Sequence, residues 1–117
     1  MRKLLVLIFS FAVLGVYADE KAACKAVTEF ATAMKQKNYA KAYQYMYNKR
    51  GRYSRERFIQ EAKNEMKPEI LSAIASLRPI SVEVDGNEAV MKCRMETVIE
   101  VKAKKVKGKW VIADMDL

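Results

Sequence analysis

The sequence predicts an α+β fold in which helices come first and an antiparallel sheet follows, behind a secretory signal peptide. From about residue 19 to 78, apolar side chains recur at three- and four-residue intervals, the pattern of amphipathic helices. From about residue 79 to 116, apolar and polar side chains alternate, as in strands with one buried face. We expect the helices to pack on one face of the sheet and to form one domain over residues 19–117.

The first 18 residues have the parts of a signal peptide. Arg2 and Lys3 form a basic start, residues 4–16 are an apolar run, and Val16 and Ala18 stand at the two positions that a signal peptidase reads. Removing 18 of the 117 residues leaves 99, with 20 basic against 14 acidic side chains and a net charge of +6. The apolar run is short for a membrane span, and an uncleaved anchor is the alternative. We therefore expect a periplasmic or secreted protein.

The two cysteines leave two arrangements open. An even number of cysteines in an oxidising compartment favours a Cys24–Cys93 disulfide. Both residues also fall beside or on apolar stripes, where two buried free thiols would pack equally well. The chain has no histidine, and the cysteines are far apart in sequence, so we expect no metal site and no cofactor.

Four helices are expected before the sheet. The first covers residues 19–37, and the second runs from Tyr39 to about Asn48 behind Asn38 as its cap. Ser54 should cap the third, from Arg55 to about Lys67. Pro68 should then open a short fourth helix. The residues expected to face inward are Ala23, Val27, Phe30, Ala31 and Met34, then Phe58, Ile59, Ala62 and Met66, and finally Ile70, Leu71, Ile74 and Leu77.

The strand half should form an antiparallel meander. Ile80, Val82 and Val84 alternate with polar residues, and residues 85–87 (DGN) predict a turn. The alternation then holds from residue 89 to 103 without Gly, Pro, Asn or Asp, which favours one long, bending strand of roughly 50 Å within residues 88–106. A hairpin with a three-residue loop is the alternative. Residues 107–109 (KGK) predict another turn, before a closing strand over residues 110–115.

Several of these segments resemble a known family. Residues 37–43 (KNYAKAY), 84–90 (VDGNEAV) and 106–112 (VKGKWVI), following a secretion signal, are similar to small exported bacterial proteins of the nuclear-transport-factor-2-like superfamily, also called cystatin-like or ketosteroid-isomerase-like. Many of those proteins have no assigned function. The resemblance implies a cone-like roll, in which a curved sheet wraps around the helices and its open end holds a small apolar molecule or a segment of a partner.

One group of aromatic and sulfur-containing residues could line such a cavity. Tyrosines recur at helical spacing, and they could meet side chains of the apolar sheet face. The candidate ligand-binding residues are Tyr39, Tyr43, Tyr47, Met91, Met95 and Trp110. The competing interpretation is ordinary core packing, since tyrosines at helical spacing usually bury their rings and leave the hydroxyl at the rim.

Clustered basic residues suggest a second kind of function. Lys49, Arg50, Arg52, Arg55 and Arg57 could attract anionic lipid headgroups, cell-wall polymers or an envelope protein. A solvated surface would explain the same charges, and an exported protein is not expected to bind nucleic acid. The sequence therefore predicts a binding protein, with an envelope interaction module acting through its basic faces as the alternative.

An enzyme of isomerase or hydrolase type is the third hypothesis. It would need a carboxylate base in the cavity and a tyrosine or a protonated acid beside it. Glu83 should lie on the wet sheet face, and Asp114 and Asp116 stand at the end of the last strand. No catalytic spacing is present, so we assign no catalytic residues.

Overall fold

The computed structural model describes residues 2–47 and 53–115, with side chains from residue 18 onward. It is an α+β fold, as predicted. The elements are α1 (Arg2–Lys35), α2 (Tyr39–Tyr43), α3 (Arg55–Asn64), α4 (Pro68–Ala75), β1 (Arg78–Asp85), β2 (Glu88–Arg94), β3 (Val98–Val106) and β4 (Lys109–Met115). The strands form an open antiparallel sheet in the order β1-β2-β3-β4.

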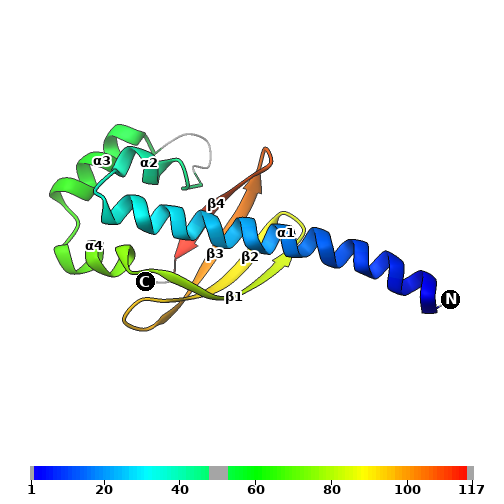
Figure 1. The fold of residues 1–117 in the computed structure, drawn as a ribbon. Coiled ribbons are helices and arrows are strands. Elements are labelled where there is room, and N and C mark those ends of the chain that lie inside the picture. Colours follow the sequence, from blue (N-terminus) through cyan, green and yellow to red (C-terminus); the bar gives the residue numbers. More distant parts are fainter. Residues whose placement is uncertain (1, 48–52, 116–117) are drawn as a thin grey trace.

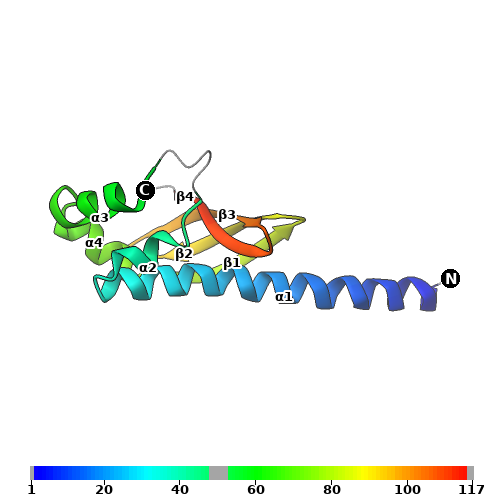
Figure 2. The same ribbon diagram turned by 90° about the horizontal axis from the view of Figure 1, so that it is seen from above.

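The helices lie on one side of the sheet and at one end of it. Helix α1 crosses the sheet and contacts β1, β2 and β4, while α2, α3 and α4 gather around its carboxyl end (Figure 1). The view from above shows α1 on one side of the sheet and its amino-terminal part projecting beyond the strands (Figure 2). Among the described residues, no helix is long and apolar enough to cross a bilayer.

The core forms where α1 meets the apolar sheet face. Alternate residues of β2 and β3 are almost fully buried, as their spacing predicts, and the larger ones, Met91 and Val101, each contribute roughly 1.5–3 kcal/mol to folding. Helix α1 supplies the opposite wall with small and medium-sized side chains. The principal members of this contact are Ala89, Met91, Cys93, Val101 and Ala103 on the sheet and Ala23, Val27, Phe30 and Met34 on α1.

The preferred long strand over residues 88–106 is wrong. The chain turns back at residues 95–97, where the Met95 N–H donates to the Thr97 carbonyl at 2.9 Å, and Arg94 pairs with Val98. A three-residue loop separates flanking residues by four positions, so the same parity continues on both sides of it. The unbroken alternation is therefore equally compatible with this hairpin, and no Gly or Asn marks the turn.

The other two turns are confirmed. Gly86 (φ 63°) turns the chain between β1 and β2, and Lys107 (φ 52°) and Gly108 (φ 77°) turn it between β3 and β4. In the β3–β4 loop, positive φ at both central residues matches the twist of the flanking strands, and in the β1–β2 loop Gly86 alone has positive φ. In β1, however, Ile80 is 55 % exposed instead of buried. The register slips between Pro79 and Ser81, so Ile80 is the extra residue of a bulge and is turned outward.

The first helix was predicted over residues 19–37. In the structure α1 begins earlier, at Arg2, and ends two residues earlier, at Lys35. At this end, Lys37 adopts a left-handed conformation (φ 58°). The Lys37 N–H donates to the Met34 carbonyl at 3.1 Å, and the Asn38 N–H donates to the Ala33 carbonyl at 2.8 Å. These two bonds form a Schellman motif, with lysine in the position that usually holds glycine.

Helix α2 is five residues long, so the predicted extension to about Asn48 is wrong. Asn38 does cap it, accepting a hydrogen bond from the Lys41 N–H. After it, the Ile112 N–H donates to the Tyr45 carbonyl at 2.6 Å, and the Tyr47 N–H donates to the Ile112 carbonyl at 2.7 Å. These two bonds pair the backbone N–H and C=O of Ile112 at the outer edge of β4. The chain makes them instead of continuing α2, although the residue pattern there is also compatible with a helix.

The remaining helices follow their predicted caps, with two corrections. Ser54 accepts a hydrogen bond from the Arg57 N–H at 3.1 Å, and Pro68 is in the first turn of α4. Helix α3 ends at Asn64 instead of about Lys67. Lys67 is extended, as expected for the residue before a proline. Ile70 was expected inside but is 43 % exposed, since Leu71 and Ile74 already occupy the inner side of α4.

Candidate functional site

One cavity with an apolar lining lies between the helices and the last strand. We call it the inner hollow; it has a volume of about 280 Å³ and draws its walls from α1, α3, α4, β4 and the segment after α2. Its lining is almost entirely apolar and includes four methionines. The lining residues are Phe30, Met34, Met46, Tyr47, Phe58, Met66, Ile74, Ile112, Ala113, Asp114 and Met115.

Asp114 is the single ionisable carboxylate in that lining, and its position does not suit a buried base. The residue is exposed, and in the register of β3 and β4 it pairs with Lys102 on the outer side of the sheet. Cross-strand partners project to the same face, so the Asp114 side chain belongs to the wet face. The side chains that define the inner hollow are therefore aliphatic, aromatic and thioether groups.

A second depression, the outer groove, lies on the other side of two of these methionines. It has a volume of about 630 Å³ and runs between the end of α1, the start of α2, α3 and α4. Met34 and Met66 line both the groove and the inner hollow, so their side chains stand between the two spaces. The groove residues are Met34, Lys35, Lys37, Tyr39, Ala62, Lys63, Met66, Pro68, Leu71, Ser72 and Ala75.

A smaller depression of about 240 Å³ lies between α1 and the β3–β4 hairpin. Tyr45 and Trp110 form part of its wall, together with Lys25, Glu29 and Lys109. Trp110 is 4 % exposed, and its buried Nε1–H has no hydrogen-bond partner among the described residues. A buried donor without a partner costs about 1–3 kcal/mol, so Trp110 contributes through the packing of its ring alone.

The structure does not bring the six predicted ligand residues into one site. Tyr47 lines the inner hollow and Tyr39 lines the outer groove. Trp110 lies in the smaller depression, and Met91 is completely buried in the core. The remaining two residues are Tyr43, which packs on Phe58, and Met95, which is half-buried in the β2–β3 loop.

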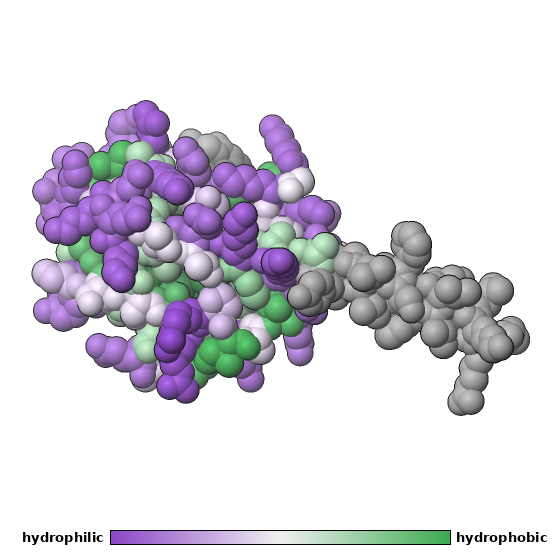
Figure 3. All heavy atoms as spheres, in the orientation of Figure 1, coloured by the Kyte–Doolittle hydropathy of each residue, from purple (hydrophilic) through white to green (hydrophobic). Residues whose placement is uncertain are grey.

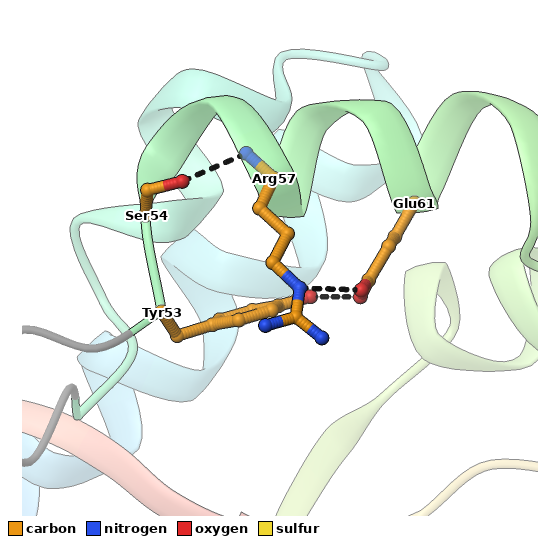
Figure 4. Close-up of polar contacts among 4 residues, drawn as sticks. All are labelled: Tyr53, Ser54, Arg57 and Glu61. Atoms are coloured by element: carbon orange, nitrogen blue, oxygen red, sulfur yellow. Dashed lines mark hydrogen bonds and ion pairs between the residues drawn. The ribbon is translucent and has the colours of Figure 1, made fainter.

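A polar cluster holds the start of α3 (Figure 4). The Tyr53 hydroxyl donates to Glu61 Oε2, and Arg57 Nε donates to Glu61 Oε1 at 3.1 Å. The Arg57 guanidinium lies 5.3 Å from the centre of the Tyr53 ring, and the Tyr43 hydroxyl donates to the Tyr53 carbonyl. Burial, followed by the hydrogen bond to Glu61, raises the pKa of Tyr53 to about 12.

This cluster contains a carboxylate beside a tyrosine, the combination that an isomerase-type enzyme would require. Its location is unsuitable, because neither Tyr53 nor Glu61 lines the inner hollow or the outer groove. The hydrogen bond from Tyr53 lowers the pKa of Glu61, which makes that carboxylate a weaker base. The arrangement is therefore suited to fixing α3 against the loop before it.

The two cysteines are free thiols, the second of the two arrangements that the sequence left open. Cys93 is buried on β2, and Cys24 is half-buried on α1 and packs against the same core. Burial, with a smaller effect from Cys24, raises the pKa of Cys93 to about 11. Burial and the nearby Glu20 also raise the pKa of Cys24. Both groups are therefore poor nucleophiles at neutral pH.

The basic set predicted around the start of α3 lies only partly within the described residues. Lys49, Arg50 and Arg52 lie outside the described residues. Arg55 and Arg57 are exposed, but Arg55 is paired with Glu56 at 3.5 Å and Arg57 with Glu61. On the face seen in Figure 3, hydrophilic residues predominate and apolar ones show mainly below α1.

Carboxylates and metal-binding groups give no further site. Glu83 is exposed on β1, as the alternation predicts, and Asp116 lies outside the described residues. Where the structure describes side chains, no three His, Cys, Asp or Glu residues come close enough to hold a metal ion. Comparison of the chain with protein-family models, with curated proteins and with solved structures gave no match.

Most residues that line the inner hollow were not predicted from the sequence to form a binding site. Met34 and Met66 were assigned to apolar helix faces without a role, and Met46 and Met115 were not singled out. The available signal was composition, since seven methionines in 117 residues is a high number and four of them meet here. Their separate positions in sequence gave no indication that they converge.

Proposed function

We propose that the protein is an exported, non-catalytic binding protein that holds a small apolar molecule in the inner hollow. The observation that carries the proposal is the hollow itself, a space of about 280 Å³ with an apolar lining. Small-molecule sites typically measure roughly 300–1000 Å³, so this one suits a compact ligand or one end of a longer ligand.

The chemistry of the lining supports an adaptable site. Thioether side chains are unbranched and polarisable, so they can adjust to ligands of different shapes. Met34, Met46, Met66 and Met115 supply this property, while Phe30 and Phe58 provide flat apolar surfaces. Such a lining favours ligands by shape and apolar area more than by directed hydrogen bonds.

Export through a cleaved signal peptide and membership of the nuclear-transport-factor-2-like superfamily are parts of the same proposal. The leader is expected to be removed after Ala18, and in Figures 1 and 2 the amino-terminal part of α1 extends past the sheet that the rest of α1 covers. Helices followed by an antiparallel sheet, with a hollow where they meet, agree with a cone-like nuclear-transport-factor-2-like architecture. We propose this membership on the segments quoted above and on that arrangement.

The two rival functions have less support. An interaction module acting through the basic set around α3 would need free cations there, but the two described members of that set, Arg55 and Arg57, are engaged with Glu56 and Glu61. An enzyme in the hollow would need a base there, and Asp114 faces the outer side of the sheet. A segment of an envelope protein remains an alternative occupant of the same hollow.

The test uses protein purified from the periplasm or medium of its host. Native mass spectrometry should detect a co-purified apolar molecule, and the neutral fluorescent probe N-phenyl-1-naphthylamine should bind to the emptied protein. Ala113→Leu, which adds volume to the lining, should weaken probe binding about tenfold. Ala40→Leu on α2 lines none of the three depressions described above and is the matched control.

Circular dichroism should show that both variants are folded. The proposal fails if wild-type protein does not bind the probe. It also fails if Ala113→Leu binds the probe as tightly as Ala40→Leu does.

A further inference from the structure

The outer groove has a charge that the inner hollow lacks. Three of its residues are the lysines Lys35, Lys37 and Lys63, and none of its residues is acidic. Glu65 and Glu69 are close in sequence but do not line it. All three lysines are exposed, so their ammonium groups are available to a bound anion.

The floor between these lysines is largely apolar, and the hydroxyl-bearing residues Tyr39 and Ser72 also line the groove. Ala62 is completely buried, and Leu71 packs against the core. Tyr39 is 7 % exposed, and it brings a phenol hydroxyl to the wall of the groove. An apolar floor with cations and a hydroxyl around it matches a ligand that has an apolar body and an anionic head.

The groove and the hollow adjoin at two flexible side chains. Met34 and Met66 line both spaces, and a methionine can change rotamer at little cost. Displacement of these two side chains would join the charged groove to the apolar hollow. A chain that is too long for about 280 Å³ could then lie with one end in each.

We infer that the groove and the hollow together bind one single-chain anionic amphiphile, such as a long-chain carboxylate. The head lies among Lys35, Lys37 and Lys63, and the chain passes between Met34 and Met66 into the inner hollow. This inference rests on the proposed function, to which it adds the class of ligand and the direction in which the ligand lies. Exposed ion pairs are individually weak, so selectivity comes from three lysines acting together.

The test compares three ligands that share one alkyl chain: dodecanoate, dodecanol and dodecyltrimethylammonium. Each is titrated below its micelle concentration by displacement of N-phenyl-1-naphthylamine from full-length exported protein. We expect dodecanoate to bind at least about fivefold more tightly than dodecanol, and the ammonium compound to bind most weakly. This order should weaken as salt is added, because salt screens exposed charges.

A charge-matched pair of variants isolates the groove. Lys35→Gln/Lys37→Gln/Lys63→Gln should weaken dodecanoate binding at least about fivefold and leave dodecanol unchanged. The control changes three exposed lysines that line none of the three depressions, Lys92→Gln/Lys102→Gln/Lys107→Gln. It removes the same net charge and should change neither affinity.

The outcomes separate this inference from the proposed function. If dodecanol displaces the probe but dodecanoate has no advantage, or if the two triple variants behave alike, the inference is wrong and the proposed function stands. If neither ligand nor probe binds, both are wrong. If the groove lysines matter only for binding to anionic phospholipid vesicles, they serve a membrane surface and the inference is wrong.

Discussion

Asp19 Oδ1 lies 3.1 Å from Lys105 Nζ, so the first residue after the expected cleavage point is held against β3. About a third of each side chain is exposed, 33 % for Lys105 and 30 % for Asp19. The pair joins positions 86 residues apart in the sequence. It ties α1 to the sheet at Asp19.

This ion pair should add little to stability. In a double-mutant cycle with Asp19→Ala and Lys105→Ala, we expect a coupling free energy below about 1 kcal/mol, because both groups are partly solvated. Urea unfolding of the four proteins measures it. A coupling of several kcal/mol would show that the pair is far less solvated than the structure indicates.

Cleavage after Ala18 should be sensitive to one position. Ala18→Phe should leave the leader attached, because signal peptidase requires a small residue immediately before the cut. Tyr17→Phe, at the tolerated neighbouring position, is the control and should be processed normally. Intact-mass measurement of exported protein should show a chain beginning at Asp19 for the wild type and the control. A wild-type chain that retains Met1 would support the uncleaved anchor.

Because Tyr53 donates a hydrogen bond to Glu61, we expect the free energy of unfolding to decrease at high pH. The pKa of Tyr53 is about 12 in the folded protein against 10.0 ordinarily, so its contribution is complete below pH 10 and is lost as the pH rises towards 12. The free energy of unfolding of wild type minus that of Tyr53→Phe should therefore decrease across that window. A flat difference would contradict the prediction.

The same contact acts in the opposite direction in acid. The pKa of Glu61 is lowered from 4.5 by its hydrogen bonds to Tyr53 and Arg57. Its contribution is therefore present above about pH 4.5 and is lost as the pH falls through the folded-state value. Glu61→Gln should reduce the pH dependence of stability in acid and bring the pKa of Tyr53 part of the way towards 10. The remaining elevation would reflect burial, the largest cause.

Lys37 ends α1, and in the inferred site it also contacts the anionic head of the ligand, so one substitution tests both. Its left-handed conformation (φ 58°) ends α1, and glycine adopts that conformation without steric cost. Lys37→Gly should raise the free energy of unfolding by up to about 1 kcal/mol. The same change should weaken dodecanoate binding, because a groove lysine is lost. A variant that is both more stable and unchanged in binding would exclude Lys37 from the head site.

Met34 and Met66 should control how quickly a ligand reaches the hollow. Met34→Leu/Met66→Leu keeps similar volume and should cost less than about 1.5 kcal/mol per site. Leucine is branched and less adaptable, so association and dissociation of dodecanoate should both slow while the affinity changes little. Stopped-flow fluorescence measures both rates. Unchanged rates would show that the ligand reaches the hollow by a different path.

The features that could be predicted from the sequence are those that a few neighbouring residues specify. The caps at Asn38 and Ser54, the proline that opens α4 and the turns at Gly86 and Gly108 are encoded within a few residues, and all were predicted. The hairpin at residues 95–97 has no such local marker. Its alternation is the same for a bent strand and for a three-residue loop, so the pattern could not distinguish them.

The sequence by itself determined the fold class and the face of the sheet that is buried, because the periodicity of apolar residues is set by near neighbours in the chain. The leader stays a prediction. Only the tertiary structure decided that Tyr45 and Tyr47 leave the helix to pair with β4. It also decided that Met34, Met46, Met66 and Met115 surround one hollow. Those outcomes depend on backbone groups and side chains far apart in the chain, whose contacts form only when helices and sheet pack together.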